Sequence, residues 1–177
     1  MVILGVMFTA VIPNIRGTDP VDELEQRATT FAQIFTLASE YSLLNNMELG
    51  LLVEEESYRF LAFDGTRWVD VPENDLLNEV SVEEPWFVEL SLHELPIDQD
   101  EQMSVSRELF EDFESESSFE DEEEPVYPQI FILSGGDITP FKMTFSYDDQ
   151  YEDPIYFEVI SGYTLPLKVE GPLYEEN

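Results

Sequence analysis

The chain has 177 residues, of which 40 are aspartate or glutamate and only 7 are lysine or arginine, giving a formal net charge of -33. Such a surface repels phosphate backbones and anionic lipid headgroups, so the composition argues against direct nucleic-acid binding and against membrane adsorption through basic patches. Hydrophobic residues make up 43% and cysteine is absent, which permits a core but excludes disulfides, thiolate catalysis and cysteine-based zinc sites.

The first twelve residues carry no charge, in contrast to the rest of the chain. A helix over residues 1–15 would be roughly 22 Å long, against about 30 Å of hydrocarbon in a bilayer, so it is too short to span a membrane alone. Two interpretations remain: a buried segment of a globular domain, or the second half of a membrane helix that begins upstream. The apolar residues of this segment are Val2, Ile3, Leu4, Val6, Met7, Phe8, Val11 and Ile12.

A long amphipathic helix is predicted next. Pro13 and Gly17 indicate a bend or break before it, Asp19 is suited to the N-cap, and Pro20 fits the first helical position. Apolar or small residues then recur at helical spacing as far as Asn45-Asn46, and they form one face that needs a sheet to cover it. The residues predicted to pack on that sheet are Val21, Leu24, Ala28, Phe31, Phe35, Ala38 and Tyr41.

The remainder of the chain is typical of strands. Asp64-Gly65 lies between two β-rich runs and predicts a hairpin turn. One long N-terminal helix followed by many strands predicts an α+β fold with antiparallel sheets. The expected strands cover residues 49–53, 58–63, 67–71, 87–92, 129–133, 142–147, 156–160 and 167–170.

Residues 98–124 differ sharply from both flanking regions, because they hold thirteen acids and one arginine. Like charges at this density resist compaction, so we expect an exposed acidic loop. Within it, one short helix is compatible with the spacing of Val105, Leu109, Phe110 and Phe113.

No catalytic motif emerges. His93 is the only histidine, and it follows an alternating strand without a nameable partner, so we interpret it as an exposed strand-end residue. Gly135-Gly136 favours a turn between two strands over a phosphate cradle, which would need more glycines leading into a helix. Because no nucleophile signature is present and forty acids form many pairs by chance, an enzyme is not expected.

The acids also fail to form a recognisable calcium loop. Asp98 and Asp100 have the spacing of the start of such a loop, but Met103 and Leu109 stand where the turn glycine and the closing glutamate belong. Residues 147–154 fail as well, although weak calcium binding by clustered acids stays open. No metal site or cofactor is therefore predicted, and an acidic calcium- or protein-binding module is kept as one alternative.

Three stretches resemble a known family. The opening "VILGVMFTAVIP" looks like the back half of the hydrophobic helix shared by type IV pilins and type II secretion pseudopilins. The helix end and the strands in "LASEYSLLNNMELGLLVEEESYRFLAFDGTRWVDV" resemble the minor pseudopilin H family, with its "Y-R-F-L" and "R-W" strands. The segment "YPQIFILSGGDITPFKMTF" is similar to the late strand pair of that family, so the resemblance covers nearly the whole chain.

The resemblance implies a pilin-like fold and a structural, non-catalytic role near the tip of the type II secretion pseudopilus, supporting export of folded exoproteins through the outer membrane. It implies single-pass anchoring in the bacterial inner membrane, a periplasmic head and a methylated N-terminus. The implied partners are the major shaft subunit, the minor tip subunits, the inner-membrane assembly platform and exoprotein cargo, with prepilin peptidase acting on the full-length precursor. No nucleic-acid partner is expected.

One departure concerns the start of the chain. The processing site of the family, Gly-Phe-Thr-Leu-x-Glu, is absent. We therefore expect that Met1 is an internal methionine or that the sequence is a fragment. On this interpretation residues 1–17 are a truncated membrane and stem helix, and residues 18–177 are the periplasmic α+β head that carries the acidic loop.

Overall fold

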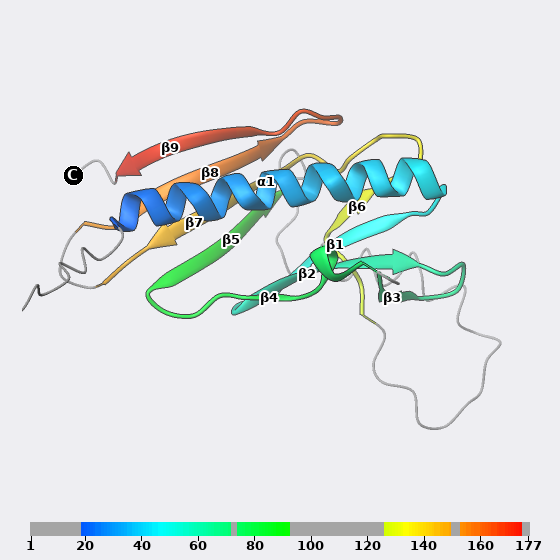
Figure 1. Cartoon of the computed structure of the whole chain (residues 1–177), viewed down its shortest axis with the longest axis horizontal. Helices are drawn as coiled ribbons and strands as arrows, with labels where there is room; N and C mark the ends of the chain where they lie inside the picture. Colours follow the sequence, from blue (N-terminus) through cyan, green and yellow to red (C-terminus); the bar gives the residue numbers. More distant parts are fainter. Residues whose placement is uncertain (1–18, 72–73, 93–125, 150–152, 175–177) are drawn as a thin grey trace, which may run out of the picture.

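The computed structural model describes residues 19–71, 74–92, 126–149 and 153–174. In these residues one long helix, α1 (Pro20–Asn45), lies across two antiparallel sheets (Figure 1). The arrangement confirms the predicted α+β class with a pilin-like order of elements. The predicted stem over residues 1–17, His93 and the acidic loop at 98–124 lie outside the described residues.

Helix α1 begins and ends where its sequence predicts. The backbone N–H of Val21 donates to the Asp19 carboxylate over 3.0 Å, which satisfies one of the free donors of the first turn. Two further acids in that turn face the positive end of the helix dipole. At the other end Asn46 adopts the left-handed conformation, and its N–H donates to the carbonyl of Ser42.

The first sheet has five strands in the order β3-β2-β1-β6, with β4 also paired to β2. The short strand β4 and a single 3-10 turn, η1 (Asp75–Leu77), are absent from the sequence prediction. The strands of this five-stranded sheet are β1 (Leu49–Val53), β2 (Ser57–Phe63), β3 (Trp68–Asp70), β4 (Val80–Ser81) and β6 (Ile130–Ile132).

The second sheet has four strands in the order β5-β7-β8-β9. The last strand is longer than predicted, because a Gly-Pro pair that usually punctuates structure lies inside it. A Cβ at Gly171 would lie 2.5 Å from the ring of Phe157, so glycine is what lets β9 approach β8 here. The strands of this four-stranded sheet are β5 (Trp86–Leu92), β7 (Phe141–Tyr147), β8 (Ile155–Ser161) and β9 (Lys168–Tyr174).

The two predicted turns are confirmed. Backbone N–H groups of Thr66 and Arg67 donate to the Asp64 carboxylate, and Gly65 takes a φ of 101°, which suits glycine. Between β6 and β7, the N–H of Gly136 donates to the carbonyl of Leu133 over 2.9 Å and closes a tight turn.

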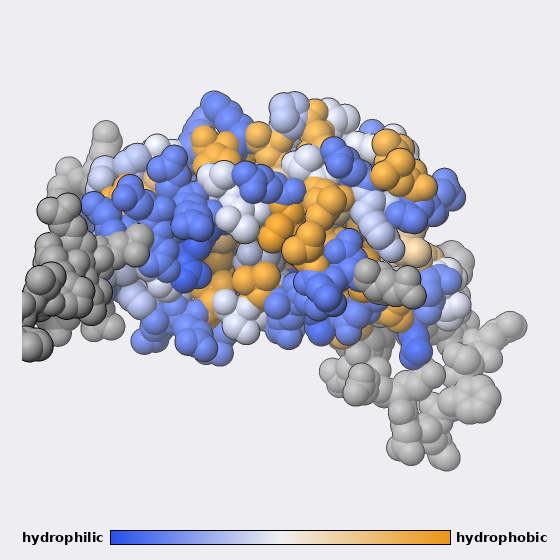
Figure 2. All heavy atoms as spheres, in the orientation of Figure 1, coloured by the Kyte–Doolittle hydropathy of each residue, from blue (hydrophilic) through white to orange (hydrophobic). Residues whose placement is uncertain are grey.

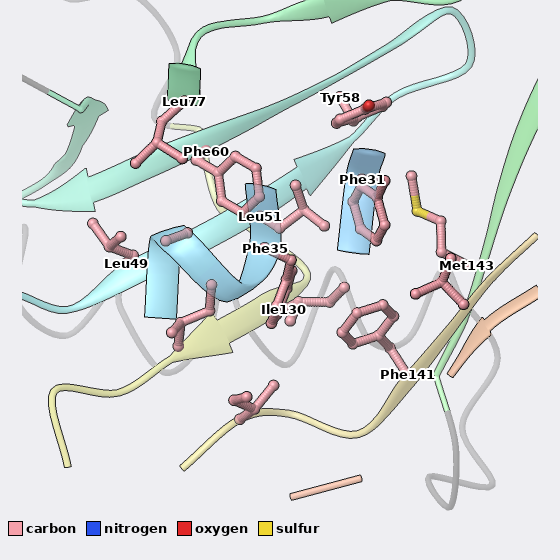
Figure 3. Packing of buried hydrophobic residues seen from close by; sticks show 14 of the residues in the cluster. Phe31, Phe35, Leu49, Leu51, Tyr58, Phe60, Leu77, Ile130, Phe141 and Met143 are labelled. Carbon is pink, nitrogen blue, oxygen red and sulfur yellow. The ribbon is translucent and has the colours of Figure 1, made fainter. Parts of the chain in front are cut away.

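One core joins the helix to both sheets. Phe31 and Phe35 of α1 point between the strands, with residues of both sheets around them (Figure 3). The Phe35 ring centroid lies 6.0 Å from that of Phe60 on β2 and 5.0 Å from that of Phe141 on β7. Because α1 contacts both sheets, removing it would expose the inner face of each.

The five-stranded sheet also buries its other face. Leu52 and Leu61 are only 4% and 3% exposed, yet they lie outside the main core cluster. Trp68 packs against Phe131 on this side, with ring centroids 5.8 Å apart. Pro128 covers the strand next to them, so this sheet has a second apolar layer.

Candidate assembly surface

Every helix residue that was predicted to pack on a sheet is found in the core cluster or in contact with it. This face of α1 is apolar over almost its whole length, so it fixes the helix to the globular part. Buried residues are Leu24, Ala28, Phe31, Phe35 and Ala38, and partly buried ones are Val21 and Tyr41.

The opposite face of α1 is polar over its first half. It bears an open depression lined by acids, amides and hydroxyls, and hydrophilic residues dominate this end of the view in Figure 2. The lining is polar and acidic throughout and contains no basic side chain, so the surface suits contact with solvent or with another chain. The lining residues are Asp22, Glu25, Gln26, Thr29, Thr30 and Gln33.

Arg27 connects the helix to the four-stranded sheet. Its guanidinium donates to Glu23 over 2.8 Å and lies 4.6 Å from the ring centroid of Trp86 on β5. Burial raises the pKa of the nearby Tyr58 to about 12, and the positive charge of Arg27 partly offsets that rise. Tyr58 therefore stays neutral at physiological pH, and it packs edge-on against Phe31 with ring centroids 5.4 Å apart.

Backbone hydrogen bonds join turns from distant parts of the sequence in two places. The N–H of Val82 donates to the carbonyl of Glu56, and the N–H of Asp148 donates to the carbonyl of Pro85. These bonds bring the acidic turn at residues 54–56 beside the strand β4 and the β7–β8 connection beside the β4–β5 connection. Each bond therefore brings together acidic segments that are far apart in the chain.

All lysines and arginines of the described residues have an acidic neighbour. Arg27, Lys142 and Lys168 make close ion pairs. The nitrogen–oxygen distances of the Arg59 and Arg67 pairs are longer, at 3.9 and 4.0 Å. The described surface consequently has no patch of unpaired positive charge. The pairs are Arg27–Glu23, Arg59–Asp70, Arg67–Asp64, Lys142–Glu158 and Lys168–Glu170.

The pKa of Asp64 is lowered mainly by backbone hydrogen bonds and less by a charged neighbour. The backbone N–H groups of Arg67 and then Thr66 lower the pKa of Asp64, with a smaller contribution from the charge of Arg67. The same two hydrogen bonds hold the hairpin turn, so this carboxylate has a structural role.

Metal binding has no support in the part of the chain that the structure describes. There, no three acidic or histidine side chains are arranged to hold an ion. The calcium-like spacing at residues 98–109 falls outside the described ranges, and residues 147–154 fall only partly inside them. Likewise, the helix found in the described ranges is not apolar enough over a sufficient length to cross a membrane.

Sequence reasoning missed one surface, the side of the four-stranded sheet that faces away from α1, which we call the open face. The alternation at residues 87–92 predicted a half-buried strand but not which side faces out. Phe87 and Leu173 are 42% and 39% exposed on this face, at the two edges of the sheet. The open face comprises Phe87, Glu89, Ser91, Lys142, Thr144, Ser146, Tyr156, Glu158, Ile160, Lys168, Glu170 and Leu173.

Comparison with known proteins gives a consistent result, although no family model matches the chain. Type II secretion system protein H of Aeromonas hydrophila is 24% identical over 164 residues, which cover 90% of this chain and 81% of that protein. The protein of the same name from Vibrio cholerae is 25% identical over 146 residues, covering 78% of this chain and 75% of that protein.

Solved structures share the fold. The minor pseudopilin EpsH of the Vibrio cholerae type II secretion system superposes with a TM-score of 0.62 at 21% identity, covering 89% of this chain and 100% of that one. The solution structure of Escherichia coli GspH gives a TM-score of 0.56 at 18% identity, covering 89% and 95%. The fold is thus that of a type IV pilin-like minor pseudopilin. The sequence relatives agree with this likeness of fold, because both are named type II secretion system protein H.

Proposed function

We propose that this chain is a structural minor subunit of the type II secretion pseudopilus, located near its tip, where it supports export of folded exoproteins through the outer membrane. The observation that carries the proposal is the sequence likeness over 90% of the chain, which extends through the helix and the sheets instead of stopping at the apolar start. The relatives give no support to an unrelated calcium- or protein-binding module.

The proposed role is mechanical, and no reaction is assigned to the chain. Residues 1–17 would form the membrane-proximal stem, anchored in the bacterial inner membrane with the head in the periplasm. On assembly, the apolar side chains between Val2 and Ile12 would exchange lipid contacts for contacts with neighbouring stems, and both environments are apolar. The packed face of α1 then makes the head move with its stem.

The implied partners follow from this role. They are the major shaft subunit, other minor tip subunits, the inner-membrane assembly platform and exoprotein cargo. Prepilin peptidase would process a full-length precursor, which includes methylation of the new N-terminus. Because the described surface pairs its few basic side chains with acids, nucleic acid is not among the partners we propose.

Gene deletion in the natural host tests the function. We expect folded exoproteins to accumulate in the periplasm and to disappear from the medium, and a plasmid carrying the full-length gene to restore secretion. A periplasmic marker enzyme serves as the control for leakage, and it must stay inside the cell in every strain. Undiminished secretion by the deletion strain would contradict the proposal.

A further inference from the structure

The open face has the makeup of a protein contact surface. Phe87 on β5, Ser146 on β7, Tyr156 on β8 and Leu173 on β9 are successive register partners, so they form one row across all four strands. Two aromatic side chains and a leucine in one row, on a rigid sheet, give the large apolar anchors that dominate binding energy in protein interfaces.

Charges on the open face are nearly balanced, in contrast to the chain as a whole. Lys142 of β7 donates over 2.8 Å to Glu158, which lies diagonally opposite on β8, and Lys168 pairs with Glu170 on β9. Glu89 is the one further charged residue of this face. Two lysines therefore stand against three glutamates here, within a chain whose formal net charge is -33.

This balance matters for association. A partner that approaches an acidic region must bring compensating positive charge or bear the cost of repulsion. The turn at residues 54–56 and the connection at residues 83–85, by contrast, together carry five acids and no lysine or arginine. On the open face, the internal ion pairs have already neutralised most of the charge, so apolar contact is possible without a strongly basic partner.

We propose that the open face is the docking surface for a different subunit of the same fibre, one whose contacting surface is apolar at its centre and neutral to basic at its rim. The proposal rests on the proposed pseudopilus function and names the contact that the function requires. A second copy of this chain is the less favourable occupant, because a formal charge of -33 on each chain opposes self-association.

Photocrosslinking in secreting cells tests the proposal with the full-length chain. A photoreactive phenylalanine analogue replaces Phe87, and in a second strain it replaces Leu76, which is 62% exposed on η1 outside the open face. We expect crosslinks from position 87 to another pseudopilin, at least tenfold more abundant than those from position 76. Crosslinks mainly to a second copy of this chain, or equal yields from both positions, would overturn the proposal.

Phe87→Glu gives an independent measure, with Leu76→Glu as the matched control. Thermal unfolding of each purified variant first establishes that it folds like the wild type. We expect Phe87→Glu to reduce co-purification of the other subunit at least tenfold and Leu76→Glu to leave it unchanged. If folded Phe87→Glu retains its partner, the open face is not the docking surface. If the wild-type chain itself co-purifies with no pseudopilin, the proposed function fails, which is a distinct result.

Discussion

The two sheets of this head differ in whether the face that points away from α1 is buried. The five-stranded sheet buries Leu52 and Leu61 on the side away from α1, and Trp68 and Pro128 pack against Gly50 on that same side. The four-stranded sheet buries one side only and exposes a row that includes Phe87 and Leu173. The comparison indicates that both faces of the five-stranded sheet stabilise the fold, whereas one face of the four-stranded sheet is exposed and can contact another molecule.

The largest effect is expected from Phe35→Ala, because this side chain packs between the two sheets. Its removal leaves a cavity between Phe60 and Phe141 and should lower the free energy of unfolding by about 3–5 kcal/mol. Denaturant titration followed by fluorescence and far-UV circular dichroism measures the loss. Phe87→Ala, on the open face, is the control and should cost less than about 1 kcal/mol.

Raising the pH above 10 should lower the stability of the fold, because the buried Tyr58 on β2 resists ionisation. The pKa of Tyr58 is about 12 in the folded chain, above its ordinary value of 10.0, so its contribution to stability is complete below pH 10 and is lost as the pH rises toward 12. Two pKa units correspond to about 2–3 kcal/mol. Stability measured against pH should therefore fall more steeply for the wild type than for Tyr58→Phe, and parallel curves would disprove this origin.

Gly50→Ala tests whether the outer side of the five-stranded sheet is closely packed. An added Cβ would lie 2.3 Å from Cγ of Pro128, so the proline must shift, at an expected cost of about 1–3 kcal/mol. Gly162→Ala is the matched control, because no atom lies within 4 Å of the added carbon. Equal melting temperatures for the two variants would show that Pro128 is not held against the sheet.

The smallest effect is expected on the open face itself. Lys142→Met removes an ion pair whose side chains are 31% and 21% exposed, and we expect a loss of no more than about 1 kcal/mol that shrinks as salt is added. Arg67→Met removes a 4.0 Å contact of a more exposed side chain and should change nothing measurable. A salt-independent loss at Lys142 would mean that packing of its aliphatic stem, not charge, is lost.

Local sequence signals predicted much of this fold. The Asp19 cap, the helical spacing up to Asn46 and the turns at Asp64-Gly65 and Gly135-Gly136 depend on neighbouring residues, and each is found in the structure. The division of the strands between two sheets was not predictable in this way. It depends on pairings such as Leu51 with Ile130, which lie far apart in the chain.

The open face escaped prediction for a related reason. Alternation identifies two sides of a strand such as β5, but only the position of α1 decides which side is covered. Lys142 and Glu158 are unremarkable in a chain with forty acids, and they become informative only when the register places them together. The same argument applies to Gly50, whose requirement for glycine comes from Pro128.

The far end of α1 is tied down as well as packed. The Ser42 hydroxyl donates to the carbonyl of Met47 over 2.7 Å and lies 3.3 Å from the carbonyl of Ile132 on β6. The helix is therefore held by aromatic side chains that pack between the sheets and by the hydrogen bonds of Ser42 near its C-terminus. We therefore expect tension applied at the Asp19 end to be shared by both sheets, because core residues along α1 pack against each of them.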